Sequence, residues 1–148
     1  MQKFEKLPIM PVDKVPSWIS LKICGDITHN IEFQANELHN LSNSIVTGDF
    51  YCNDGWVTKG LKWKGVTVSD LFKEAKIEIS EHSSVEFRGG AYSKVLTVED
   101  VIQSSVLVAG ELNGALLSSP HGGPFRLIGG NRSADFHVKW LTEICVYS

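Results

Sequence analysis

The sequence predicts an α+β fold, with a mixed, partly barrel-like β-sheet and a few short helices. Short apolar-polar runs are scattered along the chain and do not alternate with helices as in a doubly wound parallel fold. Capping sequences at 67–70 and 97–100 mark two helix starts. Asn113-Gly114 lies between two apolar runs, a pattern typical of a type I′ hairpin.

Composition indicates one soluble globular domain over residues 1–148. Apolar residues make up 43% of the chain and charged residues 21%, which is ordinary for a domain with one core. The net charge of -3 argues against a general nucleic-acid binder, and no apolar run approaches the roughly 20 residues that span a bilayer. The segment 1–16 is punctuated by prolines and is predicted to be irregular. It has neither a signal-peptide apolar region nor an Arg-Arg pair, so we expect a cytoplasmic protein.

The first half of the chain contains signals for several short strands and for two helices. Ile19, Leu21 and Ile23 share one face of an alternating run. The apolar residues that follow Thr67 recur at helical spacing, with Asp70 in the first turn. The expected elements are a strand at 17–27, its hairpin partner at 29–34, a helix with Asn36 as N-cap, a strand at 44–52, an extended piece at 62–66 and a helix to about 75.

The second half is predicted to consist mainly of short strands. Gly89-Gly90 provides a turn between two of them, and Thr97 starts a short helix. The expected elements are strands at 84–87 and 92–96, a helix at 97–104, the hairpin at 106–117, a loop at 118–125, and closing strands at 125–128 and 138–147.

The three cysteines divide into two kinds. Cys24 and Cys145 lie inside apolar strand patterns and are interpreted as buried thiols. The odd number of cysteines in the chain and their wide spacing suggest neither a disulfide framework nor a structural zinc site. Cys52 instead ends a strand, directly before the turn formers at 53–55. It is a packing thiol, a nucleophile or a single thiolate ligand to a metal.

The segment 120–132, PHGGPFRLIGGNR, is the strongest candidate for binding an anion. Two of the three arginines of the chain fall in it, and Gly122-Gly123 permits close backbone approach to a ligand. It is neither a Walker A loop nor a Rossmann fingerprint. The alternative is a hydrated surface loop with solvated charges. The charged candidates are His121, Arg126, Arg132 and Lys139.

Several motifs occur together in a fixed order. They are CNDGW at 52–56, WKGVTVSDL at 63–71, LNGALLSSPHGGPFRL at 112–127 and VKWLTEI at 138–144. In this combination the chain resembles the molybdopterin-binding domain of the sulfite oxidase family from Pro11 to Tyr147. The resemblance implies the sulfite-oxidase-type fold and a molybdenum–molybdopterin cofactor.

The resemblance also implies roles for individual residues. Cys52 matches the family's protein ligand to molybdenum, with the other sulfurs coming from the cofactor. Residues at three matching positions hold the pterin and its phosphate: His121, Arg126 and Lys139. Weaker candidates for lining the pocket are Trp56, Gly122 and Gly123. Arg132 is a candidate on its charge alone. Tyr92 is a candidate catalytic residue near the open metal position.

The function expected from this resemblance is two-electron or oxygen-atom-transfer chemistry on a small substrate. An external cytochrome or flavoprotein would carry the electrons. The segment LPIMPVDKVP and the turn at 89–92 lack substrate residues that sulfite-oxidising members carry, so sulfite oxidation itself is not expected. One alternative is a non-catalytic module that binds molybdopterin or a phosphorylated anion. Another is a cysteine-nucleophile enzyme that uses Cys52 and His121.

Overall fold

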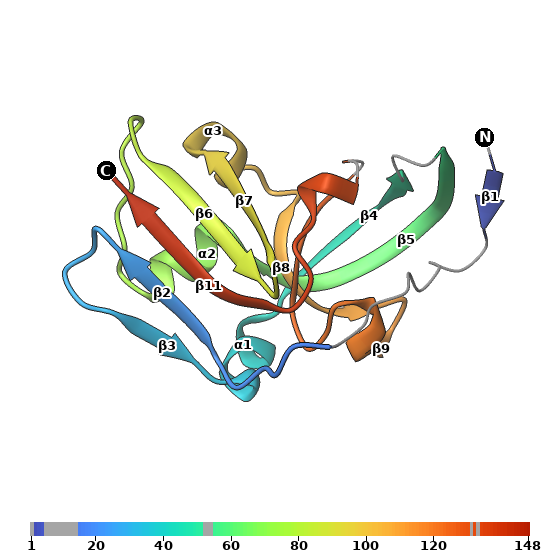
Figure 1. The fold of residues 1–148 in the computed structure, drawn as a ribbon, viewed down its shortest axis with the longest axis horizontal. Helices are drawn as coiled ribbons and strands as arrows, with labels where there is room; N and C mark the ends of the chain where they lie inside the picture. Colours follow the sequence, from blue (N-terminus) through green and yellow to red (C-terminus); the bar gives the residue numbers. More distant parts are fainter. Residues whose placement is uncertain (1, 5–14, 52–54, 131, 133) are drawn as a thin grey trace.

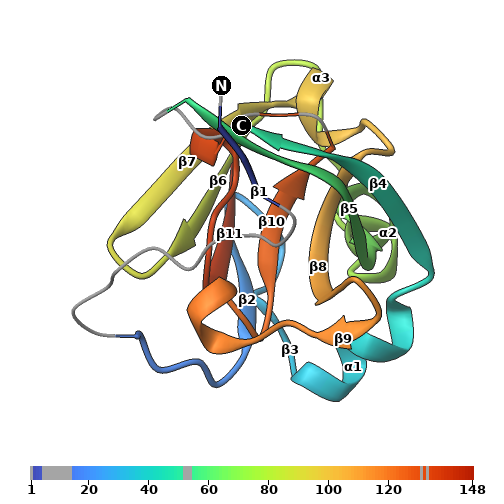
Figure 2. The same cartoon turned by 90° about the vertical axis from the view of Figure 1, so that its right-hand side faces the viewer.

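The computed structural model of the chain describes residues 2–4, 15–51, 55–130, 132 and 134–148. Within these residues the chain forms two β-sheets that face each other across the main core (Figures 1 and 2). The first sheet contains β1 (Gln2–Phe4), β4 (Ser44–Tyr51), β5 (Trp56–Thr67), β8 (Val106–Leu112), β9 (Ala115–Leu116) and β10 (Arg126–Gly129). The second contains β2 (Leu21–Gly25), β3 (Ile31–Phe33), β6 (Ser84–Gly89), β7 (Tyr92–Thr97) and β11 (Leu141–Tyr147).

Both sheets are mixed, as the sequence predicts. The first has the strand order β1-β5-β8-β10, with β4 paired to β5 and β9 paired to β8. The second has the order β3-β2-β11-β6-β7. The pairs β1–β5 and β2–β11 are parallel, and the other ladders are antiparallel. A sequence of short strands and scattered helices has therefore produced an α+β fold.

The first sheet is covered by apolar side chains on both faces. The main core lies between the sheets and includes Val66, Val108 and Leu127 from the first sheet. Neighbouring residues of the same strands point to the opposite face and form a second, smaller core with Trp63 and Ile128. This smaller core supports the candidate site described below.

The short helices are α1 (Ala35–Leu41), α2 (Val68–Glu74), α3 (Val98–Val101), η1 (Ser119–His121) and η2 (Ala134–Phe136). The capping predictions for α2 and α3 are confirmed, because the Thr67 and Thr97 hydroxyls accept hydrogen bonds from the N–H groups of Asp70 and Asp100, the third residue of each helix. The N-cap of α1 is Gln34 instead of Asn36, since Glu37 Oε1 accepts from the Gln34 N–H at 2.9 Å. No helix in the described ranges is long and apolar enough to cross a bilayer.

In the N-terminal half, two boundary predictions are wrong and a third element is longer than predicted. The first strand covers Leu21–Gly25 and not 17–27, which leaves Ile19 outside the sheet and 79% exposed. Residues 2–4 of the segment predicted as irregular pair with β5 as a strand. The extended piece predicted at 62–66 belongs to the 12-residue β5. A Cβ at Gly65 would overlap the Val108 carbonyl, so glycine lets β5 shift its register against β8.

The later hairpin is confirmed and the last strand is shorter than predicted. Asn113 and Gly114 both have positive φ, +51° and +84°, as a type I′ turn requires. The final strand begins at Leu141 and not at 138, because Trp140 has a φ of +52° that interrupts an extended chain. Val138 forms an isolated bridge with Leu127.

Cys24 and Cys145 are joined as a disulfide, so the interpretation of two separate buried thiols is wrong. They lie directly opposite each other on the parallel strands β2 and β11. The pairing of the second strand with the last one depends on the sheet topology. Local sequence patterns do not contain that information.

Candidate functional site

Arg126, the first residue of β10, is the centre of the candidate site. Its side chain is 2% exposed. The guanidinium carbon lies 5.4 Å from the Phe50 ring centroid and 5.2 Å from that of Trp63. These rings come from β4 and β5 of the same sheet, so the smaller core holds the cation between aromatic faces.

The hydrogen bonds of Arg126 go to neutral acceptors. Nη1 donates to the His121 carbonyl oxygen at 3.0 Å, and Nη2 donates to Nδ1 of His137 at 3.0 Å. The buried Nε has no partner, and no carboxylate of the described residues forms an ion pair with this side chain. Burial lowers the pKa of Arg126 to about 9, so the group is charged at neutral pH. The result is a buried positive charge with an unused donor.

His137 is a site residue that the sequence analysis missed. It is 5% exposed, and its ring lies 5.2 Å from Phe50 and 5.9 Å from Trp63, both edge-on. Because Arg126 can only donate, Nδ1 of His137 is the acceptor and Nε2–H faces the Gly129 oxygen at 3.3 Å. Burial and the nearby Arg126 charge hold the pKa of His137 well below its ordinary value. Only its position two residues before Lys139 could have drawn attention to it.

The turn at 119–123 presents two carbonyl oxygens to two cations. Arg126 donates to the oxygen of His121, and Lys139 Nζ donates to that of Pro120 at 3.2 Å. The His121 ring is held from the other side, with Nδ1 3.1 Å from Ser118 Oγ. The structure therefore brings together three of the predicted ligands, His121, Arg126 and Lys139.

Lys139 is half-buried beside this turn. Burial, and then the charge of Arg126, lower the pKa of the Lys139 amine. Its Nζ also lies 5.6 Å from the Trp140 ring centroid. A second cation near Arg126 raises the local positive potential, which favours an anion at this turn.

Gly122 and Gly123 allow close approach, but the approaching groups belong to the protein itself. Gly122 has a φ of +96°, and a Cβ there would lie 2.6 Å from Lys139 Cγ. A Cβ at Gly123 would overlap the Leu117 carbonyl. Their N–H groups donate to the oxygens of Ser119 and Ser118, at 2.9 and 2.8 Å. Both glycines shape the turn, and their N–H groups are used within it.

The predicted metal ligand Cys52 lies outside the described residues, as does the side chain of Trp56. The strand that leads to Cys52 can still be located. β4 ends at Tyr51, and Phe50 on that strand contacts both Arg126 and His137. The described part of β4 therefore contacts the cation cluster through Phe50.

Tyr92 and Arg132 contact residues outside the group formed by His121, Arg126 and Lys139. The Tyr92 hydroxyl donates to the carbonyl oxygen of Asp135, and the residue, at the start of β7, is 44% exposed. Arg132 forms an ion pair with Asp100 at 2.9 Å and covers the Phe136 ring at 4.7 Å. None of the contacts of these two side chains in the described ranges reaches His121, Arg126 or Lys139.

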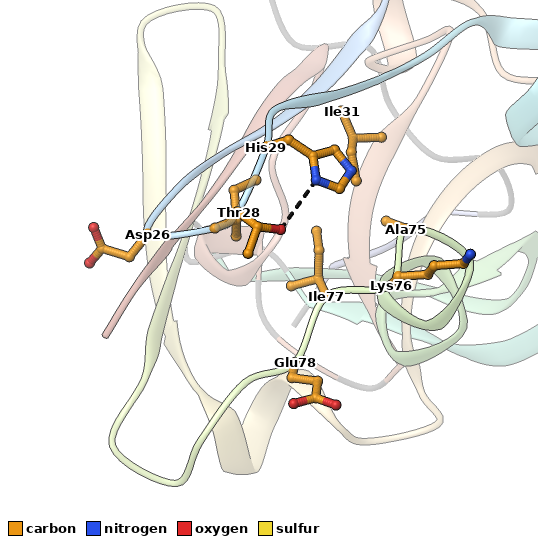
Figure 3. Close-up of a pocket in the computed structure, with 9 residues that line it drawn as sticks. Asp26, Thr28, His29, Ile31, Ala75, Lys76, Ile77 and Glu78 are labelled. Atoms are coloured by element: carbon orange, nitrogen blue, oxygen red, sulfur yellow. Dashed lines mark hydrogen bonds between the residues drawn. The ribbon is translucent and has the colours of Figure 1, made fainter.

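Two hollows on the surface differ in their relation to the site. One of about 360 Å³ is lined in part by Gly123 and Pro124 and so lies along the same turn. Another, of about 220 Å³, lies between the β2–β3 loop and the end of α2 (Figure 3). There the Thr28 hydroxyl and Nδ1 of His29 lie 3.2 Å apart. No residue predicted as a ligand lines this second hollow.

Comparisons with known proteins indicate the family to which the chain belongs. Residues 7–148 match the family described as oxidoreductase molybdopterin binding domain. Mitochondrial sulfite oxidase of Drosophila melanogaster is 30% identical over 94 residues, which cover 57% of this chain and 16% of that protein. The crystal structure of the sulfane dehydrogenase SoxCD from Paracoccus pantotrophus superposes with a TM-score of 0.77 at 21% identity, over 94% of this chain and 40% of that chain.

The two relatives carry different weight. The chain spans only 16% of the sulfite oxidase and 40% of the SoxCD chain, so neither whole protein's activity transfers to it. The likeness to SoxCD shows the shared fold, and the match over 7–148 covers nearly the whole chain. The chain therefore belongs to the oxidoreductase molybdopterin-binding domain family, of the sulfite oxidase type, as its motifs indicate.

Proposed function

We propose that this protein is a molybdopterin-dependent oxidoreductase that carries out two-electron or oxygen-atom-transfer chemistry on a small substrate. The observation that carries the proposal is the buried Arg126 cation, which has an unused Nε donor and no carboxylate partner among the described residues. A buried charge is costly unless it is paired. An anionic group of a bound cofactor would supply the missing partner.

The donor set fits such a cofactor. A phosphate monoester prefers the forked donors of arginine together with an ammonium group, and Arg126 and Lys139 both donate to carbonyl oxygens of one turn. His121 and Trp56 would line the pterin, and the Cys52 thiolate would be the protein's ligand to molybdenum. When bound, the molybdenum centre supplies the two-electron redox change, and an external cytochrome or flavoprotein exchanges the electrons.

The chain's own residues bind, orient and exclude water. Phe50 and Trp63 keep Arg126 out of water, so its attraction for an anion is stronger than at an exposed site. Gly122 leaves room for the Lys139 side chain beside the turn. Tyr92 stays a candidate for contact with the substrate on the sequence alone.

The metal and pterin content of the purified protein tests the proposal. Protein from a molybdenum-replete host should carry about one molybdenum and one pterin per chain. We expect Cys52→Ser to remove turnover and to alter the metal's thiolate absorption while the protein still folds. Wild-type protein without molybdenum and pterin, or full turnover in Cys52→Ser, would refute the assignment.

An alternative is a module that binds molybdopterin or another phosphorylated anion without catalysis. The observation that favours it is that the cations of Arg126 and Lys139 meet at the turn that carries His121, an arrangement that would attract an anion without any metal. Metal-free protein that binds phosphorylated pterins, and that shows no turnover after loading with cofactor, would support the module.

A further inference from the structure

A second group of potential ligands lies on the other sheet, on the face that points away from the main core. It consists of Cys24 on β2 and of Glu143 and Cys145 on β11. Their sulfur and carboxylate atoms all lie within 4.8 Å of one another. We propose that, when the two cysteines are reduced, these three side chains form a binding site for a divalent zinc-class ion.

Strand geometry holds the three ligands together. Cys24 and Cys145 are register partners on adjacent parallel strands, with their Cα atoms 4.5 Å apart. Glu143 precedes Cys145 by two residues, so both side chains lie on the same face of β11. Both strands are interior strands of the second sheet, and their backbones are therefore fixed by neighbours on each side.

The donor types suit a borderline metal ion. Zinc is bound in proteins by thiolates and carboxylates, usually with four ligands. The Cys24 sulfur lies 3.9 Å from Glu143 Oε2. A divalent cation bound between these side chains would be attracted to the carboxylate and to both thiolates at once.

Two of the three ligands are accessible. Cys24 and Glu143 are half-buried, whereas Cys145 is 3% exposed. An ion can therefore reach the group from the side of Cys24 and Glu143, where water can fill a fourth position. Arg88 Nη1 lies 3.9 Å from Glu143 Oε2 and helps to orient the carboxylate.

Binding is coupled to the redox state of the pair. In the oxidised protein both sulfurs are used in the disulfide and offer no thiolate. An external dithiol breaks the S–S bond by supplying two electrons and two protons, and it becomes a disulfide itself. Each thiol then loses its proton when it binds the metal. The site is therefore open only in the reduced form.

Cobalt titration with optical detection tests the proposal. Cys52→Ser protein, which removes the third thiol, is reduced with a phosphine and titrated with Co²⁺ as a spectroscopic probe for zinc. We expect one ion per chain, a thiolate-to-cobalt band in the near ultraviolet, and competition by Zn²⁺. Adding Cys24→Ser or Cys145→Ser should weaken binding by about 100-fold, and Glu143→Gln by about tenfold.

Two controls separate ligation from folding. Glu86→Gln removes a carboxylate that also contacts Arg88 but lies outside the ligand group, so it should leave the affinity unchanged. The second control is the same Cys52→Ser protein left oxidised, which should not show the thiolate-to-cobalt band. The proposal is overturned if the reduced protein shows no such band, or if the oxidised protein or the serine variants bind cobalt equally well.

Discussion

Nη2 of Arg126 lies 3.0 Å from Nδ1 of His137, so a neutral histidine accepts a hydrogen bond from a buried guanidinium. Protonation of His137 would remove this acceptor and place two cations side by side in a nonpolar setting. His137 therefore orients Arg126 without neutralising it. Arg126 therefore keeps its charge beside the turn formed by residues 119–123.

The Arg126–His137 contact predicts a pH dependence of stability. The pKa of His137 is lowered on folding, so below about pH 6.5 the unfolded chain binds more protons than the folded one. The free energy of unfolding should fall by about 1 kcal/mol between pH 7.5 and 5.5 for this residue. Urea denaturation at the two pH values measures it. His137→Asn should remove this part of the loss, and His82→Asn, at an exposed surface position, should not. An unchanged pH dependence in His137→Asn would contradict the assignment.

Gly122→Ala should disturb the site through Lys139. Its new Cβ would lie 2.6 Å from Lys139 Cγ at a φ of +96°. Gly114→Ala is the matched control, since Gly114 has a φ of +84° but no other atom within 4 Å. Both variants incur backbone strain, but only Gly122→Ala displaces the lysine. We expect Gly122→Ala to cost about 1–3 kcal/mol more in unfolding free energy and to weaken pterin retention. Equal behaviour of the two variants would show that the contact does not matter.

The sequence predicted the elements whose cause is local. Thr67 and Thr97 begin helices because their hydroxyls accept from the helix backbone, and Asn113-Gly114 forms its turn because both residues accept positive φ. The three charged cofactor candidates also lie close together in the structure. His121 and Arg126 are only five residues apart in sequence. Lys139 lies near them because the preceding residue, Val138, forms a bridge with Leu127 of β10.

The sequence could not predict features that depend on distant partners. β1 is a strand only because β5 lies beside it, and Cys24 meets Cys145 only because the sheet pairs β2 with β11. His137 looks like an ordinary polar residue until Arg126 is packed against it. Arg132 had the right charge and the right segment, but Asp100 on another element takes its guanidinium.

Arg132 and Arg126 should respond differently to the same substitution. Arg132 is paired with Asp100 at a partly exposed position, so Arg132→Gln should cost at most about 1 kcal/mol and should leave pterin content unchanged. Arg126→Gln removes the buried cation and should lower pterin content at least about tenfold. Fluorescence of the released pterin after gel filtration measures both. Loss of pterin in Arg132→Gln would show that Arg132 does contribute to cofactor binding.

The disulfide should make stability depend on reducing agent. Cys24 and Cys145 are 121 residues apart in sequence, and closing a loop of about 100 residues restricts the unfolded chain by about 4.7 kcal/mol in the chain-entropy description. We therefore expect a dithiol, with a chelator present to keep metal away, to lower Tm by roughly 10 °C. The Cys24→Ser/Cys145→Ser double variant should have a Tm close to that of the reduced wild type, and the dithiol should not change it. Cys52→Ser should respond as the wild type does, since the pair is intact. A wild-type Tm that is the same with and without dithiol would show that the two sulfurs are not joined in solution.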